Sequence, residues 1–226
     1  MKDNQMKHKA LSLALLGTAC ISFAGCDLTT KEQPNHLKRT PEFQVHELII
    51  NRWSSRAMSG ELITQQELMS LFEAAKWAPS AHNNQPWRFL YAQKETPHWD
   101  RFFNLLVPFN QSWTKNASTL IVVLSSKNFE HNEKPSRTHS FDTGSACQNL
   151  LLQATLLGLV AHSMEGFDYD RARKELSIPD TYDIEAMIAI GKPGDVKKLP
   201  EGLQKMEQPS ERKSVHELIR EGNFTP

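Results

Sequence analysis

The feature that most constrains the fold is a segment from about Gly144 to Leu157, which has helical composition and apolar residues on nearly every side. Asp142 and Thr143 precede this segment, and their side chains can cap the first turn of a helix. A helix that is apolar all round has to be buried on most of its faces, by its own domain or by a second subunit. The chain must therefore build a layered body around this helix, and its 226 residues suffice for one domain with a substantial core.

Three short segments are predicted to form the strands of that body. Residues 120–124 are β-branched or leucine throughout and carry no charge, which is typical of a strand buried on both faces. Residues 87–92 are apolar and rich in aromatic side chains, which also favours a strand. Residues 184–190 alternate with a period of two and end at Gly191, so we predict a third strand there.

Helical signals surround these strands. Apolar residues recur at helical spacing between residues 42 and 51. Thr64 and Glu67 form a capping box ahead of an apolar stripe, and Pro79 stops that helix. A second capping box at residues 214–217 opens a short helix near the C-terminus. Few strands among several helices indicate an α+β fold.

Charge and cysteine content exclude some classes of function. The 26 basic and 26 acidic residues give a net charge of zero, so there is no basic surplus for binding nucleic acid. Cys20, Cys26 and Cys147 lie in unrelated surroundings, and none has a set of metal ligands nearby. Neither a zinc site nor a disulfide framework is predicted.

The first 25 residues have the organisation of an export signal. Lysines precede an apolar run from Ala10 to Phe23, which is too short to span a bilayer comfortably. The ending Phe-Ala-Gly-Cys resembles a bacterial lipobox, in which Cys26 is lipidated and becomes the mature N-terminus. We therefore expect a signal peptide over residues 1–25 and a lipoprotein anchored to a membrane on its extracytoplasmic, periplasmic side. The alternative is an uncleaved hydrophobic leader on a cytoplasmic protein.

Residues 26–41 consist largely of Thr, Lys, Gln, Pro and Asn, with scarcely an apolar side chain to bury. This composition predicts a flexible tether. The folded domain is expected over residues 42–226, which contain no internal repeat and no second domain boundary.

Two short motifs carry the functional signal. Residues 52–56 read Arg-Trp-Ser-Ser-Arg, and they place two guanidinium groups and two hydroxyls directly after the first predicted helix. Residues 78–87 form a polar loop, braced by prolines, between a predicted helix and a predicted strand. Guanidinium groups bind phosphate oxygens two at a time, and amide side chains both donate and accept hydrogen bonds. A flat organic cofactor with a phosphate tail requires both kinds of element.

These motifs resemble those of the FMN-dependent nitroreductase family. The resemblance runs from about Val45 to Phe224 and includes five separated motifs in the order of that family. It implies an α+β fold in which a nitroreductase-like mixed sheet is surrounded by helices. It also implies an intertwined homodimer with two FMN sites at its interface, which would explain the apolar long helix.

The resemblance assigns the phosphate tail of FMN to residues at both ends of the domain. Arg52 and Arg212 match the phosphate-binding arginines of the family. Ser54 matches a contact to the phosphate or the ribityl chain, and Trp53 contributes backbone groups. Arg56 matches a cation beside the pyrimidine edge of the flavin, where it would stabilise the negative charge of the reduced ring.

Amide-bearing segments match the polar edge of the flavin. The loop that contacts the flavin, in part from the partner subunit, matches Pro79, Ser80, Ala81, Asn83 and Gln85. Asn110 matches a further amide at the same edge. His82 lies inside the loop, but the family needs no histidine there, and we interpret it as an exposed loop residue.

A third segment matches the part of the family that runs along the flavin face. The backbone N–H of Glu165 would point at N5, the flavin atom that accepts and gives hydride, with Met164 and Gly166 on either side. Gly166 lets the main chain approach closely. Trp113 stands where the family has a second cation, and it either lines the substrate side of the ring or belongs to the core.

The resemblance implies a flavin oxidoreductase that works in two steps. NAD(P)H passes hydride to FMN and leaves, and a small electron-poor acceptor such as a nitroaromatic or a quinone then enters the same slot. No catalytic side chain and no metal are required. The alternatives are another flavin chemistry, namely dehalogenation or flavin cleavage, and a lipoprotein that binds a ligand without turnover. Residues 127–140 form either a substrate lid or a solvated loop.

Overall fold

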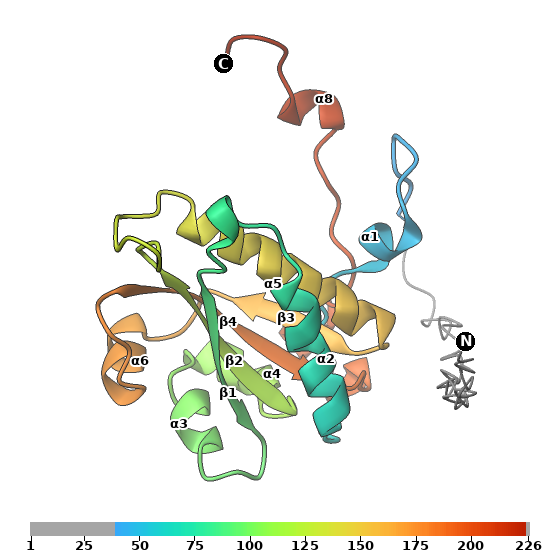
Figure 1. Cartoon of the computed structure of the whole chain (residues 1–226). Coiled ribbons are helices and arrows are strands. Elements are labelled where there is room, and N and C mark those ends of the chain that lie inside the picture. The colour runs from blue at the N-terminus through green and yellow to red at the C-terminus, as the bar shows by residue number, and fades with distance from the viewer. Residues whose placement is uncertain (1–38, 225–226) are drawn as a thin grey trace, which may run out of the picture.

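The computed structural model describes residues 39–224, and these contain a four-stranded sheet in the order β1-β2-β4-β3 (Figure 1). The central strand β2 (Thr119–Ser126) pairs with β1 (Trp87–Gln93) on one side and with β4 (Tyr182–Gly191) on the other. The edge strand β3 (Val160–Met164) pairs with β4 and is the strand that the sequence analysis did not predict. The three predicted strands and the α+β class are confirmed.

All pairings between the described strands are antiparallel, whereas a mixed sheet was expected. The periodicity of a segment identifies a strand but carries no information about its direction. Strand β2 is buried along nearly its whole length, as its charge-free sequence requires. A register shift between Val123 and Leu124 interrupts its pairing with β4.

Two helices cover one face of the sheet. Helix α2 (Gln65–Lys76) and helix α5 (His139–Leu156) lie side by side across this face (Figure 1). Because side chains alternate along a strand, Ile121 and Val123 point to these helices and form one core cluster with them. The capping box of Thr64 and Glu67 begins α2, as predicted.

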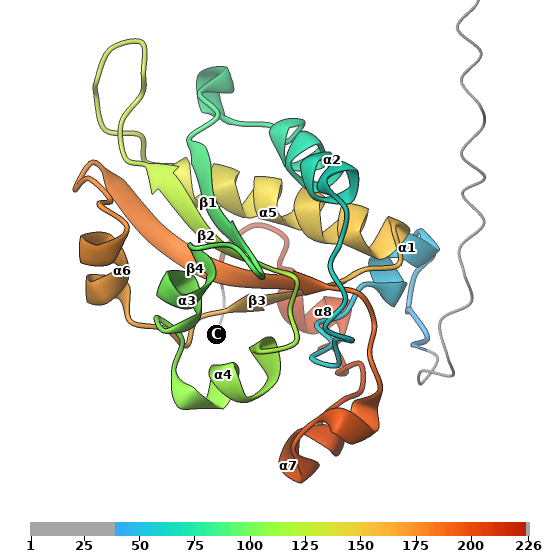
Figure 2. The same cartoon turned by 90° about the horizontal axis from the view of Figure 1, so that it is seen from below.

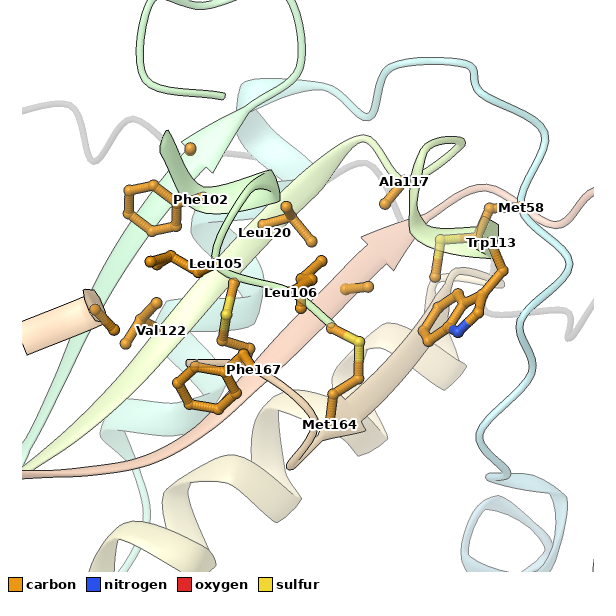
Figure 3. Packing of buried hydrophobic residues seen from close by; sticks show 14 of the residues in the cluster. Met58, Phe102, Leu105, Leu106, Trp113, Ala117, Leu120, Val122, Met164 and Phe167 are labelled. Carbon is orange, nitrogen blue, oxygen red and sulfur yellow. The ribbon is translucent and has the colours of Figure 1, made fainter. Parts of the chain in front are cut away.

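The other face of the sheet is covered by shorter elements. Helices α3 (Trp99–Phe103) and α4 (Pro108–Thr114) lie below it, and α6 (Tyr169–Glu175) lies near its edge (Figure 2). Leu120 and Val122 point to this side, where they join a second core cluster that includes Phe102, Leu105 and Leu106 (Figure 3). These three helices were not predicted, because each has only five to seven residues and no full apolar stripe.

Helix α5 begins earlier than predicted, which corrects the role given to Asp142 and Thr143. Its N-cap is Thr138, and both residues lie buried inside the first turns. The Asp142 carboxylate accepts hydrogen bonds from the backbone N–H of Ala81 at 3.0 Å and from the Thr138 hydroxyl at 3.2 Å. Asp142 therefore fastens the loop after α2 to the long helix. Polar residues in the first turn concealed the true start of the helix.

The remaining elements are short helices, which lie near the two ends of the described chain or in connections between larger elements. Helix α1 (Glu47–Asn51) is shorter than predicted, because His46 caps it by accepting from the N–H of Leu48 at 3.2 Å. The short helices η1 (Ala81–Asn83), η2 (Val196–Lys198) and α7 (Glu201–Gln204) lie in connections between the larger elements. Helix α8 (Val215–Leu218) opens with the predicted capping box. It lies within an extended C-terminal arm, which leads away from the sheet and continues beyond α8 to the last described residue (Figure 1).

The predicted signal peptide, Cys26 and most of the predicted tether lie outside the described residues. Arg39 and the two residues that follow it belong to the predicted tether and are described. None of the helices between residues 39 and 224 combines the length and the apolar character needed to cross a membrane.

Candidate cofactor site

A cavity of about 270 Å³ lies where the start of the described chain meets the segment before the C-terminal arm. Four arginines line it: Arg39, Arg52, Arg56 and Arg212. Trp53 and Ser54 line it as well, so the structure brings together all the residues matched to the phosphate and to its neighbouring cation. Arg39 also lines the cavity, although the sequence did not predict it as a site residue.

Arg52 lies at the end of α1 and is held in an extended conformation. Its Nη1 donates to the Ser54 hydroxyl at 3.4 Å. Burial lowers the pKa of Arg52 below its ordinary value, and the nearby charges of Arg212 and Arg39 lower it further. On the opposite side, Nη1 of Arg212 donates to the Ser210 hydroxyl at 2.9 Å, which fixes the guanidinium at the base of the C-terminal arm.

The arginines of the cavity are not neutralised by ion pairs with described residues. No carboxylate among residues 39–224 forms an ion pair with any of its four arginines. The Nε atoms of Arg39 and Arg56 are buried and make no hydrogen bond to a described residue. Buried polar groups are normally satisfied, and gathered cations repel one another. A bound phosphate monoester would supply both the acceptors and the negative charge, so these residues fit the tail of FMN.

Glu207 positions the loop that carries Arg56, and sequence reasoning missed it. One carboxylate oxygen accepts from the Ser55 hydroxyl at 2.5 Å and from the backbone N–H groups of Arg56 and Ala57 at 2.7 and 2.9 Å. The side chain is only 9% exposed. This single carboxylate therefore joins the loop after α1 to the segment that leads to Arg212. A lone Glu in a polar stretch gives no local signal of such a role.

His162 is a second residue of the cavity that the sequence analysis did not identify. It lies on β3 and is 9% exposed, with its ring 4.7 Å from the ring of Trp113. Its Nδ1 is 3.1 Å from the carbonyl oxygen of Ser55, so Nδ1 carries the proton and donates it. Burial lowers the pKa of His162 to about 4. The imidazole is therefore neutral at pH 7, and it adds a polar group without another cation.

Protonation of His162 is expected to destabilise the fold below about pH 6. The unfolded histidine takes up its proton near pH 6.5, and the folded one only near pH 4. The unfolded state thus binds more protons in this window, and the free energy of unfolding falls as the pH drops through it, by about 3 kcal/mol in all. Urea titrations at pH 7 and pH 4.5 of the wild type and of His162→Gln measure this. The variant should lose clearly less stability, and equal losses would contradict the assignment.

The segment after β3 is held by Asn110, which the resemblance placed at the flavin edge. The Asn110 amide donates to the carbonyl of Gly166 at 2.9 Å, and its oxygen accepts from the indole N–H of Trp113 at 3.3 Å. A Cβ at Gly166 would lie 2.7 Å from the Asn110 amide nitrogen. A side chain at this position would therefore have to displace the Asn110 amide that donates to the Gly166 carbonyl. The contact of Asn110 with the flavin remains a prediction.

Two side chains near this segment belong to the core. Trp113 is 1% exposed and packs beside Met58 (Figure 3). Of the two alternatives for Trp113, the substrate side of the ring or the core, the structure has the core. Met164 is also buried, and its side chain packs in the same cluster (Figure 3). The side chain of Met164 is therefore not available to a ligand on this side, whereas Glu165 is exposed.

The loop that follows α2 lines a different hollow of about 340 Å³. Asn83 and Gln85 lie there together with Arg88 and His131, while Ser80 accepts from the N–H of Gln85 at 3.0 Å. The two hollows share no lining residue. Within one chain, then, the structure does not bring this loop, with Pro79 and Ala81, to the arginine cavity.

The backbone of this loop is unusual. His82, Asn83 and Gln85 have positive φ angles of 53°, 52° and 49°, which side chains other than glycine rarely adopt. His82 is exposed, as predicted, and its ring packs edge-on against Phe129 at 5.5 Å. The hairpin around Phe129 thus braces the loop. Such strain persists only where surrounding contacts impose it, and it is common at functional sites.

Comparison with known proteins identifies the relatives of this chain. The model of the Nitroreductase family matches residues 49–107 and 96–192. A crystal structure described as an oxidoreductase containing FMN is 44% identical, with a TM-score of 0.80, and the match covers 85% of this chain and 99% of that one. A structure from Desulfovibrio desulfuricans in complex with FMN, provisionally named a nitroreductase, is 26% identical with a TM-score of 0.62 and covers 79% and 96%.

A relative from Archaeoglobus fulgidus, provisionally named an NADH dehydrogenase/NAD(P)H nitroreductase, is 28% identical over 159 residues. This match covers 66% of the present chain and 86% of the relative.

Proposed function

The chain belongs to the nitroreductase family, and we propose on that basis that it is an FMN-dependent oxidoreductase. In this proposal NAD(P)H is the electron donor, and a small electron-poor molecule such as a nitroaromatic or a quinone is the acceptor. The observation that carries the proposal is the cavity lined by four arginines that form no ion pair with a described carboxylate. FMN in two related structures supports the identity of the anion.

When bound, FMN supplies the hydride chemistry, and the protein supplies binding, orientation and electrostatics. Arg52 and Arg212 bind the phosphate through charge-assisted hydrogen bonds. Arg56 would place a positive charge close to the polar edge of the ring, where it would favour the reduced state. The backbone of Glu165 and Gly166 would lie along the ring, and this chemistry requires no side chain as nucleophile or proton donor.

We further propose that the active form is a homodimer. The loop of residues 79–85 and the arginine cavity are separate in one chain, so a partner's loop is needed to complete a site that contains both. Large apolar side chains are exposed on α5 and on the C-terminal arm, with Phe141 77%, Leu218 66% and Phe224 87% exposed. Exposed apolar surface of this kind is typical of an interface.

The visible spectrum of the purified protein tests the proposal directly. We expect bound flavin, or uptake of added FMN, followed by bleaching of the flavin absorbance when NADH or NADPH is added without oxygen. Reoxidation by a nitroaromatic or a quinone should then follow. A protein that neither contains flavin nor takes up FMN would overturn the proposal in favour of ligand binding without turnover. Bound flavin that nicotinamide donors fail to reduce would instead favour another flavin chemistry.

A further inference from the structure

Arg39 is tied to the end of helix α1. Its Nη1 donates to the carbonyl oxygens of Ile50 at 2.9 Å and of Arg52 at 3.2 Å. These are the only hydrogen bonds of the Arg39 guanidinium with described residues, and they leave its buried Nε without a partner. The group is thus anchored through one nitrogen at the wall of the cavity, and it keeps donors unused.

The charge of Arg39 is not neutralised by its surroundings. Burial lowers its pKa, and the nearby charge of Arg212 lowers it further, while Glu211 offsets only part of this. Arg52 experiences the same repulsion from Arg212 and Arg39. The charge of Arg212 lowers the pKa of both Arg39 and Arg52, and all three guanidinium groups line the same cavity, so they are close enough to act on one small anion.

We propose that Arg39 is a third phosphate-binding arginine of the FMN site. The inference rests on the proposed function and adds a residue to it. Arg39 comes from the segment before α1, Arg52 from the end of α1 and Arg212 from the base of the C-terminal arm. The phosphate therefore fastens these three separate parts of the chain to one another. A guanidinium held through Nη1 can still present its other donors to phosphate oxygens.

A purely structural role for Arg39 is the competing explanation, because a cation at the C-terminal end of a helix stabilises the last carbonyl groups. Comparison of FMN with riboflavin separates the two roles in the variant Arg39→Gln. The substitution removes the charge, and its side chain, two atoms shorter, also loses the hydrogen bonds to the carbonyls of Ile50 and Arg52. Riboflavin has the flavin ring and the ribityl chain without the phosphate, so a purely structural loss would weaken its binding as much as that of FMN.

The experiment measures the Kd of FMN and of riboflavin by quenching of flavin fluorescence, for the full-length wild type, Arg39→Gln and the surface control Arg171→Gln. Arg171 pairs with Glu175 on α6, away from the cavity lining. We expect Arg39→Gln to raise the Kd of FMN about tenfold, to change that of riboflavin less than twofold, and to weaken the dependence of FMN binding on salt. Arg171→Gln should leave both constants unchanged.

Two results would overturn the inference and leave the proposed function intact. One is an unchanged Kd of FMN for Arg39→Gln, and the other is an equal rise of the Kd for FMN and for riboflavin. In both cases the wild type still binds FMN, and the proposed function stands. A wild type that binds neither flavin would overturn the proposed function and the inference together.

Discussion

Arg52→Ala is expected to raise the Kd of FMN about 10- to 100-fold. Arg52 is half-buried at the end of α1 and lies with Arg39 and Arg212 at one cavity. A charge-assisted hydrogen bond contributes about 1.5–3 kcal/mol, and about 1.4 kcal/mol corresponds to a tenfold change in affinity. Arg212→Ala should have a similar effect from the opposite end of the domain. Flavin released on dilution or gel filtration, together with titration by fluorescence, measures both.

His82→Ala serves as the matched loop control for these variants. Its side chain is exposed and does not line the arginine cavity, so FMN retention should be close to that of the wild type. Equal retention of FMN by Arg52→Ala, Arg212→Ala and His82→Ala would refute the assignment of the phosphate to this cavity.

Glu207→Ala is expected to lower the free energy of unfolding by about 3–5 kcal/mol. The substitution removes one buried oxygen that three donors share, and it leaves the Ser55 hydroxyl and the N–H groups of Arg56 and Ala57 without their partner. Each buried donor left unsatisfied costs about 1–3 kcal/mol. The loop that carries Arg56 should also lose its position, so FMN retention should fall with stability. Urea denaturation and flavin content report the two effects separately.

Two controls accompany the Glu207 variant. Glu207→Gln keeps a carbonyl oxygen that can accept the same three hydrogen bonds, and it should recover at least half of the lost stability. Glu61→Ala removes an exposed carboxylate that pairs with Lys192 at the surface, which should cost less than about 1 kcal/mol. If Glu207→Ala were as stable as Glu61→Ala, the hydrogen bonds from the loop of residues 55–57 to Glu207 would not contribute to the stability of the fold.

The strands were predictable because their signals are local. The charge-free run of β2 and the alternation of β4 depend only on residues within each segment, and the structure has both strands. The capping boxes at Thr64 and Ser214 are local in the same sense. The start of α5 was misjudged for a related reason. Its first turns are polar because Asp142 bonds to a distant backbone group, and that partner cannot be read from nearby residues.

The candidate site was only partly predictable. The arginines at positions 52, 56 and 212 were found through a motif and a family resemblance. Glu207 and His162 were missed, because each acts through a hydrogen bond to the loop at Ser55, which is remote in sequence. Arg39 was missed because the composition around it is that of a linker. Composition describes a whole segment, whereas a single partly buried arginine can dock without changing the composition of its segment.

By itself, then, the amino-acid order determined the strands β1, β2 and β4, the helix α2 and both capping boxes, and it showed which residue types are available for an anion. Those properties follow from backbone periodicity and side-chain chemistry over a few residues. Only the tertiary structure decided that arginines from opposite ends of the domain share one cavity, that Trp113 and Met164 face the core, and that the amide-rich loop lies apart from that cavity. The reason is that packing of the sheet and its helices brings together groups whose distance in the chain carries no information about their distance in space.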